Sequence, residues 1–140
     1  MTTPLTRPLP SPSALTEPFW EAARENILVR PVCDDCERSF FTPQVICPHC
    51  LSGRWAYQRS SGRATIYSTT VVHRAPSPEL EAPYELALLD VEEGWSMLAN
   101  IVNGSSVPTP IGTAVEVTWI SADAGFVFPA FRAAKLKEKR

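Results

Sequence analysis

Four cysteines are the residues whose type and spacing point most directly to chemistry. They form two CxxC pairs, Cys33/Cys36 and Cys47/Cys50, with ten residues between the pairs. Two residues between cysteines let both sulfurs of a pair face one point from a single tight turn. Two such turns supply four thiolates in a tetrahedron, which Zn²⁺ accepts in closed structural sites. We therefore predict a structural zinc site whose ligands are Cys33, Cys36, Cys47 and Cys50.

Three other uses of paired cysteines compete with this prediction. Two disulfides would require an oxidising compartment, and the N-terminus lacks the charged and apolar regions of a signal peptide. A redox CxxC normally lies at a strand-to-helix turn of a βαβ unit, a pattern that does not surround these cysteines. Iron in a rubredoxin-like site stays open, because Cys47-Pro-His-Cys50 is also a CPxC turn.

The residue after each CxxC pair bears on the stability of the site. Such turns usually place glycine there, because the backbone tends toward φ > 0. Here Glu37 and Leu51 occupy these positions, so we expect strained turns and a labile site. His49 lies inside a pair whose ligand count is already complete, and we interpret it as a solvent-facing turn residue.

The totals are those of an ordinary globular protein. The chain has 140 residues, of which 44 % are hydrophobic and 20 % charged, enough for one modest core or for a small core and a metal-bound module. No apolar run approaches the roughly 20 residues that a membrane helix requires. We expect a cytoplasmic protein with reduced thiols and no membrane contact.

The charge is distributed unevenly along the chain. Residues 60–134 carry three arginines against eight acidic side chains, a net charge of −5, whereas the tail over 135–140 carries +3. A nucleic-acid binder needs a basic groove, since phosphate contacts supply most of its affinity. The largest predicted domain is therefore acidic where such a binder would be basic.

The chain begins with two short segments. Residues 1–15 contain four prolines with Thr and Ser, which predicts an extended, poorly ordered N-terminal tail. A helix is predicted within 16–30, with Thr16 as its cap and with Phe19, Ala23 and Ile27 at four-residue steps on one face. So short a helix is not stable alone, so it must dock on its own domain or on a partner. Both possibilities stay open.

The remaining chain is β in pattern. Residues 31–59 hold both CxxC pairs and form the predicted ribbon, with aromatic residues after each pair that normally pack around such a cluster. Residues 60–134 contain five strand-like segments and no helix long enough to cover a sheet, which predicts a small closed barrel. The expected fold class is mainly β, with a short N-terminal helix, a rubredoxin-like zinc ribbon, and a C-terminal five-stranded OB-fold barrel.

The order of these pieces resembles a known family, the bacterial and archaeal acyl-CoA-associated proteins that join a zinc ribbon to an OB fold. Each motif is weak alone, but their order and number along nearly the whole chain after residue 16 make the resemblance fairly specific. Besides the two CxxC pairs, the motifs are Pro18-Phe19-Trp20, Ser61-Gly62-Arg63-Ala64-Thr65-Ile66-Tyr67-Ser68, Pro83-Tyr84, Asp90-Val91-Glu92-Glu93-Gly94, Ile111-Gly112-Thr113-Ala114-Val115-Glu116-Val117 and Phe128-Pro129-Ala130-Phe131.

The resemblance implies a non-catalytic accessory subunit of a hetero-oligomer. Such subunits bind a thiolase-like acyltransferase or aldolase, or another acyl-CoA enzyme, and help to form its acyl-CoA substrate channel. Acyl-CoA would be contacted only in the complex, with its phosphates held mainly by the partner. Because large aromatics supply interface hot spots, we expect the partner interface to include Phe19, Trp20, Phe40 and Phe41.

The residues themselves agree that the chain is not a catalyst. Thiolase chemistry needs a cysteine nucleophile, and all four cysteines are assigned to metal. Only His49 and His73 could act as bases near neutral pH, and neither a nucleophile elbow nor a phosphate loop is present. The alternative function is nucleic-acid binding, which zinc ribbons and OB barrels both serve. The acidic barrel argues against it, and a plain interaction adaptor remains a third class.

Overall fold

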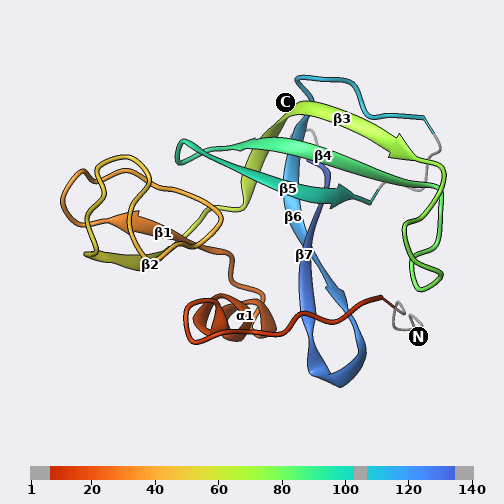
Figure 1. Cartoon of the computed structure of the whole chain (residues 1–140). Helices are drawn as coiled ribbons and strands as arrows, with labels where there is room; N and C mark the ends of the chain where they lie inside the picture. Colours follow the sequence, from red (N-terminus) through yellow and green to blue (C-terminus); the bar gives the residue numbers. More distant parts are fainter. Residues whose placement is uncertain (1–6, 103–106, 135–140) are drawn as a thin grey trace.

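The computed structural model describes residues 7–102 and 107–134. The basic tail predicted over 135–140 and the first residues of the N-terminal tail lie outside these ranges. In Figure 1 a small two-stranded ribbon lies beside a β-barrel, and helix α1 lies below both. This arrangement of helix, ribbon and barrel is the predicted fold class.

Helix α1 spans Glu17–Arg24 and is shorter than the predicted segment 16–30. Thr16 makes no side-chain bond to the helix; instead it forms a capping box with Ser13, one turn earlier. The Ser13 N–H donates to Thr16 Oγ1 at 3.0 Å, and the Thr16 N–H donates to Ser13 Oγ at 3.3 Å. Asn26, with φ 61°, turns the chain out of the helix. No helix in the described residues has the length and apolar character needed to cross a membrane.

The ribbon is an antiparallel pair of strands, β1 (Val29–Cys33) and β2 (Trp55–Arg59). The register pairs Val29 with Arg59 at one end and Cys33 with Trp55 at the other. Both CxxC turns lie on the chain between these strands, so the hairpin brings the two turns together. The ribbon's own core is small and consists of Cys33, Phe40 and Cys47, with Cys36 and Trp55 packed against it.

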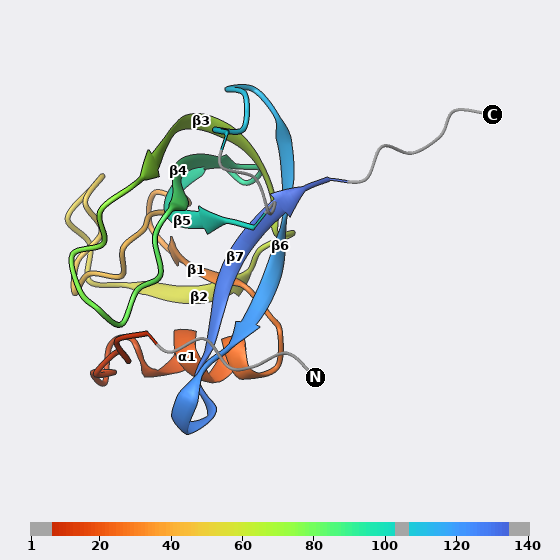
Figure 2. The ribbon, with the colours of Figure 1, turned by 90° about the vertical axis from the view of Figure 1, so that its right-hand side faces the viewer.

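The barrel is closed by five strands, as predicted. They are β3 (Arg63–Val72), β4 (Tyr84–Val91), β5 (Trp95–Ile101), β6 (Ala114–Ser121) and β7 (Val127–Ala133). Their order around the barrel is β3-β4-β5-β7-β6, and Figure 2 looks onto the side where β5, β7 and β6 meet. Alternate residues face inward, and Ile66, Leu89, Val115 and Phe131 are among the most deeply buried.

Aromatic contacts join the three parts of the molecule. The Phe41 ring, from the ribbon, lies 5.5 Å from Phe19 in α1 and 5.3 Å from Trp95 in the barrel. Trp20 packs edge-on against Phe126 and Phe128 of the β6–β7 hairpin, at 6.0 and 5.3 Å. The helix therefore docks on its own domain, one of the two possibilities that the sequence left open, and its contact with a partner stays a prediction.

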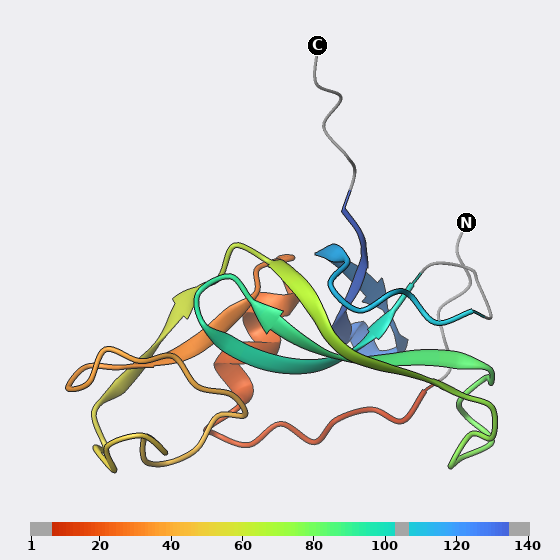
Figure 3. The same ribbon diagram turned by 90° about the horizontal axis from the view of Figure 1, so that it is seen from above.

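The described part of the N-terminal tail, residues 7–15, is extended but held in place. Figure 3 shows it running beneath the barrel. The Arg7 guanidinium lies 4.5 Å above the Phe128 ring and donates to Asn100 Oδ1 at 3.0 Å. At the other end the Tyr57 hydroxyl donates to the Leu15 carbonyl at 2.7 Å. Side chains of the barrel and the ribbon therefore contact this part of the tail at both ends.

Candidate functional site: a four-cysteine metal centre

The four cysteine sulfurs meet at one end of the ribbon. All lie within 4.8 Å of one another. Cys33 Sγ is 3.5 Å from Cys50 Sγ, and Cys36 Sγ is 3.7 Å from Cys47 Sγ. Zinc–sulfur bonds of about 2.3 Å in a tetrahedron place neighbouring sulfurs about 3.8 Å apart. The geometry and the donor type therefore fit a closed four-thiolate metal site, as the spacing predicted.

The backbone of each CxxC turn is folded around its first sulfur. The Glu37 N–H donates to the Cys33 carbonyl at 3.0 Å, and the Leu51 N–H donates to the Cys47 carbonyl at 2.8 Å. In the second turn the His49 N–H points to Cys47 Sγ at 3.4 Å. In the first turn the Cys36 N–H points to Cys33 Sγ at 3.5 Å, so a backbone N–H is directed at the first sulfur of each pair.

Both turns contain the left-handed residue that the sequence predicted. Glu37 has φ 62° and Leu51 has φ 66°. A non-glycine residue in this conformation costs roughly 1–2 kcal/mol, because its Cβ crowds the following carbonyl oxygen. The two turns therefore hold strain that glycine would relieve.

The thiols cannot all ionise together without a cation. The backbone N–H of Cys36 is the main cause that lowers the pKa of Cys33 to about 7. At Cys50 the N–H of Ser52 acts in the same direction, but desolvation and the neighbouring sulfurs together raise the pKa to about 12. A divalent metal ion would supply the positive charge that four adjacent thiolates require.

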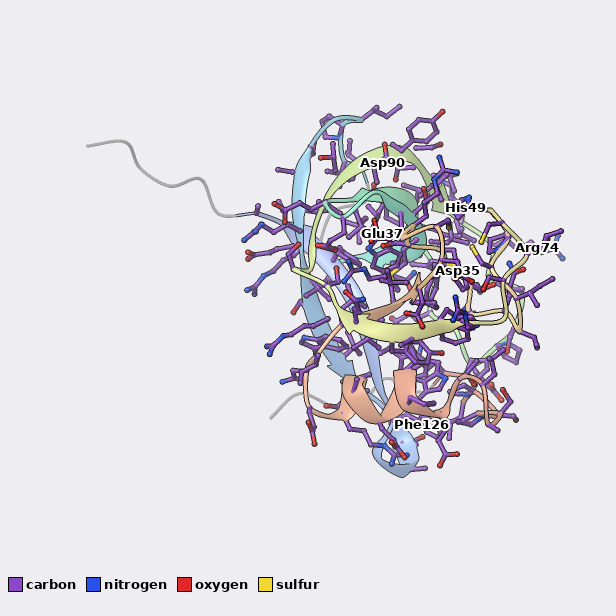
Figure 4. The ribbon with its side chains drawn as sticks, turned by 90° about the vertical axis from the view of Figure 1, so that its left-hand side faces the viewer. Asp35, Glu37, His49, Arg74, Asp90 and Phe126 are labelled. Carbon is purple, nitrogen blue, oxygen red and sulfur yellow. The ribbon has the colours of Figure 1, made fainter. Side chains whose placement is uncertain are left out.

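Polar side chains connect the two turns around the sulfurs. The Asp35 carboxylate, at the first turn, accepts hydrogen bonds from Arg54 and Ser52, which lie beyond the second turn. These bonds lower the pKa of Asp35, and the bond from Arg54 has the larger effect. His49 is exposed, as predicted, and its Nε2 lies 3.3 Å from the Ser39 carbonyl oxygen. Figure 4 looks onto the ribbon and labels Asp35 and His49 there. Nothing in the local sequence indicates that Asp35 connects the turns.

The structure shows how much surface the four residues of the predicted partner interface expose in this chain. Phe19 is 6 % exposed and Phe40 is 4 % exposed, so these two rings belong to the chain's own core and offer almost no surface to a partner. Phe40 packs at 5.6 Å against Trp55, beside the metal ligands. Trp20 and Phe41 keep part of their surface, but both also join modules of this chain.

Two family models together match most of the chain. The model described as "ChsH2, rubredoxin-like zinc ribbon domain" matches residues 20–56, and "ChsH2, C-terminal OB-fold domain" matches residues 57–119. The chain belongs to the ChsH2 family. The resemblance inferred from the motifs is thereby confirmed.

Two relatives of this ChsH2-family chain are named as an enzyme subunit and as a scaffold protein. It is 35 % identical over 122 residues to a "Probable enoyl-CoA hydratase alpha subunit" of Thermomonospora curvata, which covers 86 % of this chain but only 38 % of that relative. It is 31 % identical over 103 residues to a "DUF35 domain-containing scaffold protein" of Methanocaldococcus jannaschii, covering 71 % of this chain and 73 % of the relative.

A solved structure described as "Ltp2-ChsH2(DUF35) aldolase" contains a chain of the same fold. The TM-score is 0.80 at 32 % sequence identity, and the match covers 89 % of this chain and 98 % of that chain. Family membership and the clustered cysteines together support a structural zinc ion.

Proposed function

We propose that this chain is a non-catalytic accessory subunit that binds a thiolase-like acyltransferase or aldolase and helps to form its acyl-CoA substrate channel. The observation that carries the proposal is the match to nearly the full length of a chain in the Ltp2–ChsH2 aldolase. The scaffold name of the archaeal relative and the hydratase-subunit name of the bacterial relative support the same role.

The inventory of reactive groups supports the non-catalytic part of the proposal. The sequence contains four cysteines, and all four lie in the metal centre. A zinc ion held by four sulfurs has no open position for substrate or water. Of the two histidines, His49 lies against Ser39 and Arg38, and His73 is an exposed residue after β3. The contacts of the His49 ring are with a guanidinium and a carbonyl oxygen, and neither is a nucleophile that an imidazole could activate.

The charge of the barrel limits what this chain contributes to acyl-CoA binding. An acidic barrel is a poor site for the phosphates of coenzyme A, so the partner would hold them and this chain would supply apolar wall. Arg63 is engaged by Glu92, with 2.9 Å between nitrogen and oxygen. Arg74, exposed in the loop between β3 and β4 and labelled in Figure 4, is the better placed of the two to contact a phosphate.

The experiment is purification of the tagged chain from its native host, followed by reconstitution with the recombinant protein that co-purifies. We expect a stoichiometric thiolase-like subunit whose activity on acyl-CoA falls when this chain is left out, and no turnover by this chain alone. Tight binding of acyl-CoA by the isolated chain, or salt-sensitive recovery of nucleic acid alone, would overturn the proposal.

A further inference from the structure

An apolar patch lies on the outside of the barrel. Leu88 in β4 and Leu98 in β5 are directly opposite each other in the strand register, and both point away from the core. Tyr67 lies in the neighbouring strand β3, at the bulge between Ile66 and Ser68. Ser68 is the residue that pairs with Leu88. Leu98 is 61 % exposed, Tyr67 60 % and Leu88 36 %. We call these three residues the outer-sheet patch.

Leu86, on the same face of β4, is partly buried, and the other side of the patch is polar. In the adjoining row of the same face Thr65, Asp90 and Ser96 lie side by side, and all three are exposed. An antiparallel sheet with one face in water normally places polar residues at such positions. An apolar centre with a polar rim is instead the anatomy of a protein interface. In the described residues, Leu88 and Asp90 leave the outer face of β4 open.

The charges around the patch indicate what kind of surface would cover it. Asp90 is exposed and forms no ion pair with any residue of the described ranges, whereas Glu92 is paired with Arg63 and Glu116 with Arg132. Strands β4 and β5 contain neither lysine nor arginine. A second copy of this chain would bring a second unpaired Asp90 to the face, and the Arg7 guanidinium that reaches β5 is already engaged by Asn100 and Phe128. A different protein, with an apolar surface and a basic side chain facing Asp90, fits better.

We infer that the outer-sheet patch is the docking face for the acyl-CoA enzyme subunit. This inference rests on the proposed function and names the surface that carries it. The strands supply a rigid platform, because β4 is hydrogen-bonded to β3 on one side and to β5 on the other. Leu98, the most exposed leucine of the patch, is the contact whose replacement should matter most.

The test compares two lysine substitutions in the full-length chain. Leu98→Lys places a charge in the outer-sheet patch, and Val45→Lys places one on the ribbon, where Val45 is 74 % exposed. Because both side chains already face water, both variants should fold, which circular dichroism and thermal unfolding would verify. The binding partner is the recombinant enzyme subunit identified by co-purification, and affinity is measured by calorimetry.

We expect Leu98→Lys to weaken binding by at least about 30-fold, as hot-spot losses do, and Val45→Lys to leave it within about threefold. The reverse result would assign docking to the ribbon and overturn the inference. So would a Leu98→Lys variant that binds normally but loses self-association in sedimentation, because the patch would then join two copies of this chain. If the unchanged chain binds no acyl-CoA enzyme subunit, the proposed function itself fails, and the docking face with it.

Discussion

The carboxylate of Glu93 accepts a hydrogen bond from the backbone N–H of Ser61, at 3.0 Å. The Ser60 hydroxyl and the Trp95 indole N–H donate to the same carboxylate, the latter at 3.3 Å. Ser60 and Ser61 connect the ribbon to the barrel, and Glu93 lies in the tight turn between β4 and β5. One side chain thus fastens the linker between two modules to the barrel.

We predict that Glu93→Gln lowers stability in a pH-dependent manner. Partial burial acts to raise the pKa of Glu93, but hydrogen bonds from Ser60, Ser61 and Trp95 together outweigh it and lower the pKa to about 2. Since this lies below the ordinary value of 4.5, the carboxylate stabilises the fold fully above about pH 4.5, and this stability is lost as the pH falls toward 2. Because solvent screens the group in part, we expect a loss of about 1–2 kcal/mol at pH 7.

Urea unfolding of the unchanged chain and of Glu93→Gln at pH 7 and at pH 3 measures this effect. The difference between their unfolding free energies should be smaller at pH 3. Glu92→Gln is the matched control, because its exposed ion pair with Arg63 should contribute less than about 1 kcal/mol. Equal losses for the two variants would show that Glu93 has no special role.

The role of Glu93 could not be predicted from the sequence. Glu92 and Glu93 look like two solvated charges in a turn, and nothing local distinguishes them. Their difference arises from the strand register, which brings Glu93 to Ser60 across 33 positions of the chain. The cysteines are the opposite case. Their chemistry is encoded in local spacing, so the metal centre and even its left-handed turn residues could be predicted.

Trp20→Ala separates the two roles of the helix, packing on this chain and binding a partner. The ring packs on Phe126 and Phe128, and Arg24 lies 5.6 Å from the Phe126 ring centre. Because the indole is only partly buried, we expect a loss of about 2 kcal/mol in unfolding free energy, less than for a fully buried tryptophan. The highly exposed Val45→Ala should change stability by under about 0.5 kcal/mol. A stable Trp20→Ala variant that fails to assemble would support the partner interface expected for Trp20.

The aromatic residues show why a partner interface is hard to predict from sequence. Composition identifies large rings that need a partner surface, but it does not say whether that surface belongs to the same chain. The Phe41 ring of the ribbon packs against Phe19 of the helix and Trp95 of the barrel. Only the folded structure shows these contacts. The exposed leucines of the outer-sheet patch were missed for the related reason that an apolar position in a strand is normally taken to be covered.

Leu51→Gly should stabilise the ribbon. The side chain is 70 % exposed and its φ is 66°, so glycine relieves the backbone strain while little buried area is lost. After subtraction of glycine's greater freedom in the unfolded chain, we expect a net gain of about 0.5–1 kcal/mol. Slower metal transfer to a chromophoric chelator would report the gain. Gln58→Gly, exposed on β2 with negative φ, is the control and should destabilise instead; a loss from Leu51→Gly would contradict the strain argument.

Metal removal should unfold the ribbon and leave the barrel folded. Three of the five residues in the ribbon's small core are cysteine ligands, so loss of the ion removes the attraction that holds the two CxxC turns together. The barrel core lies in a separate cluster that includes Ile66, Leu89 and Phe131. Hydrogen exchange after chelation, with metal loss confirmed by elemental analysis, should show lost protection in β1 and β2 but retained protection in β4 and β5.

Because Phe41 and the Ser60–Ser61 linker attach the ribbon to the barrel, we also expect the complex with the enzyme subunit to loosen. Full protection of β1 and β2 in the metal-free protein would show that the ribbon is held by packing alone.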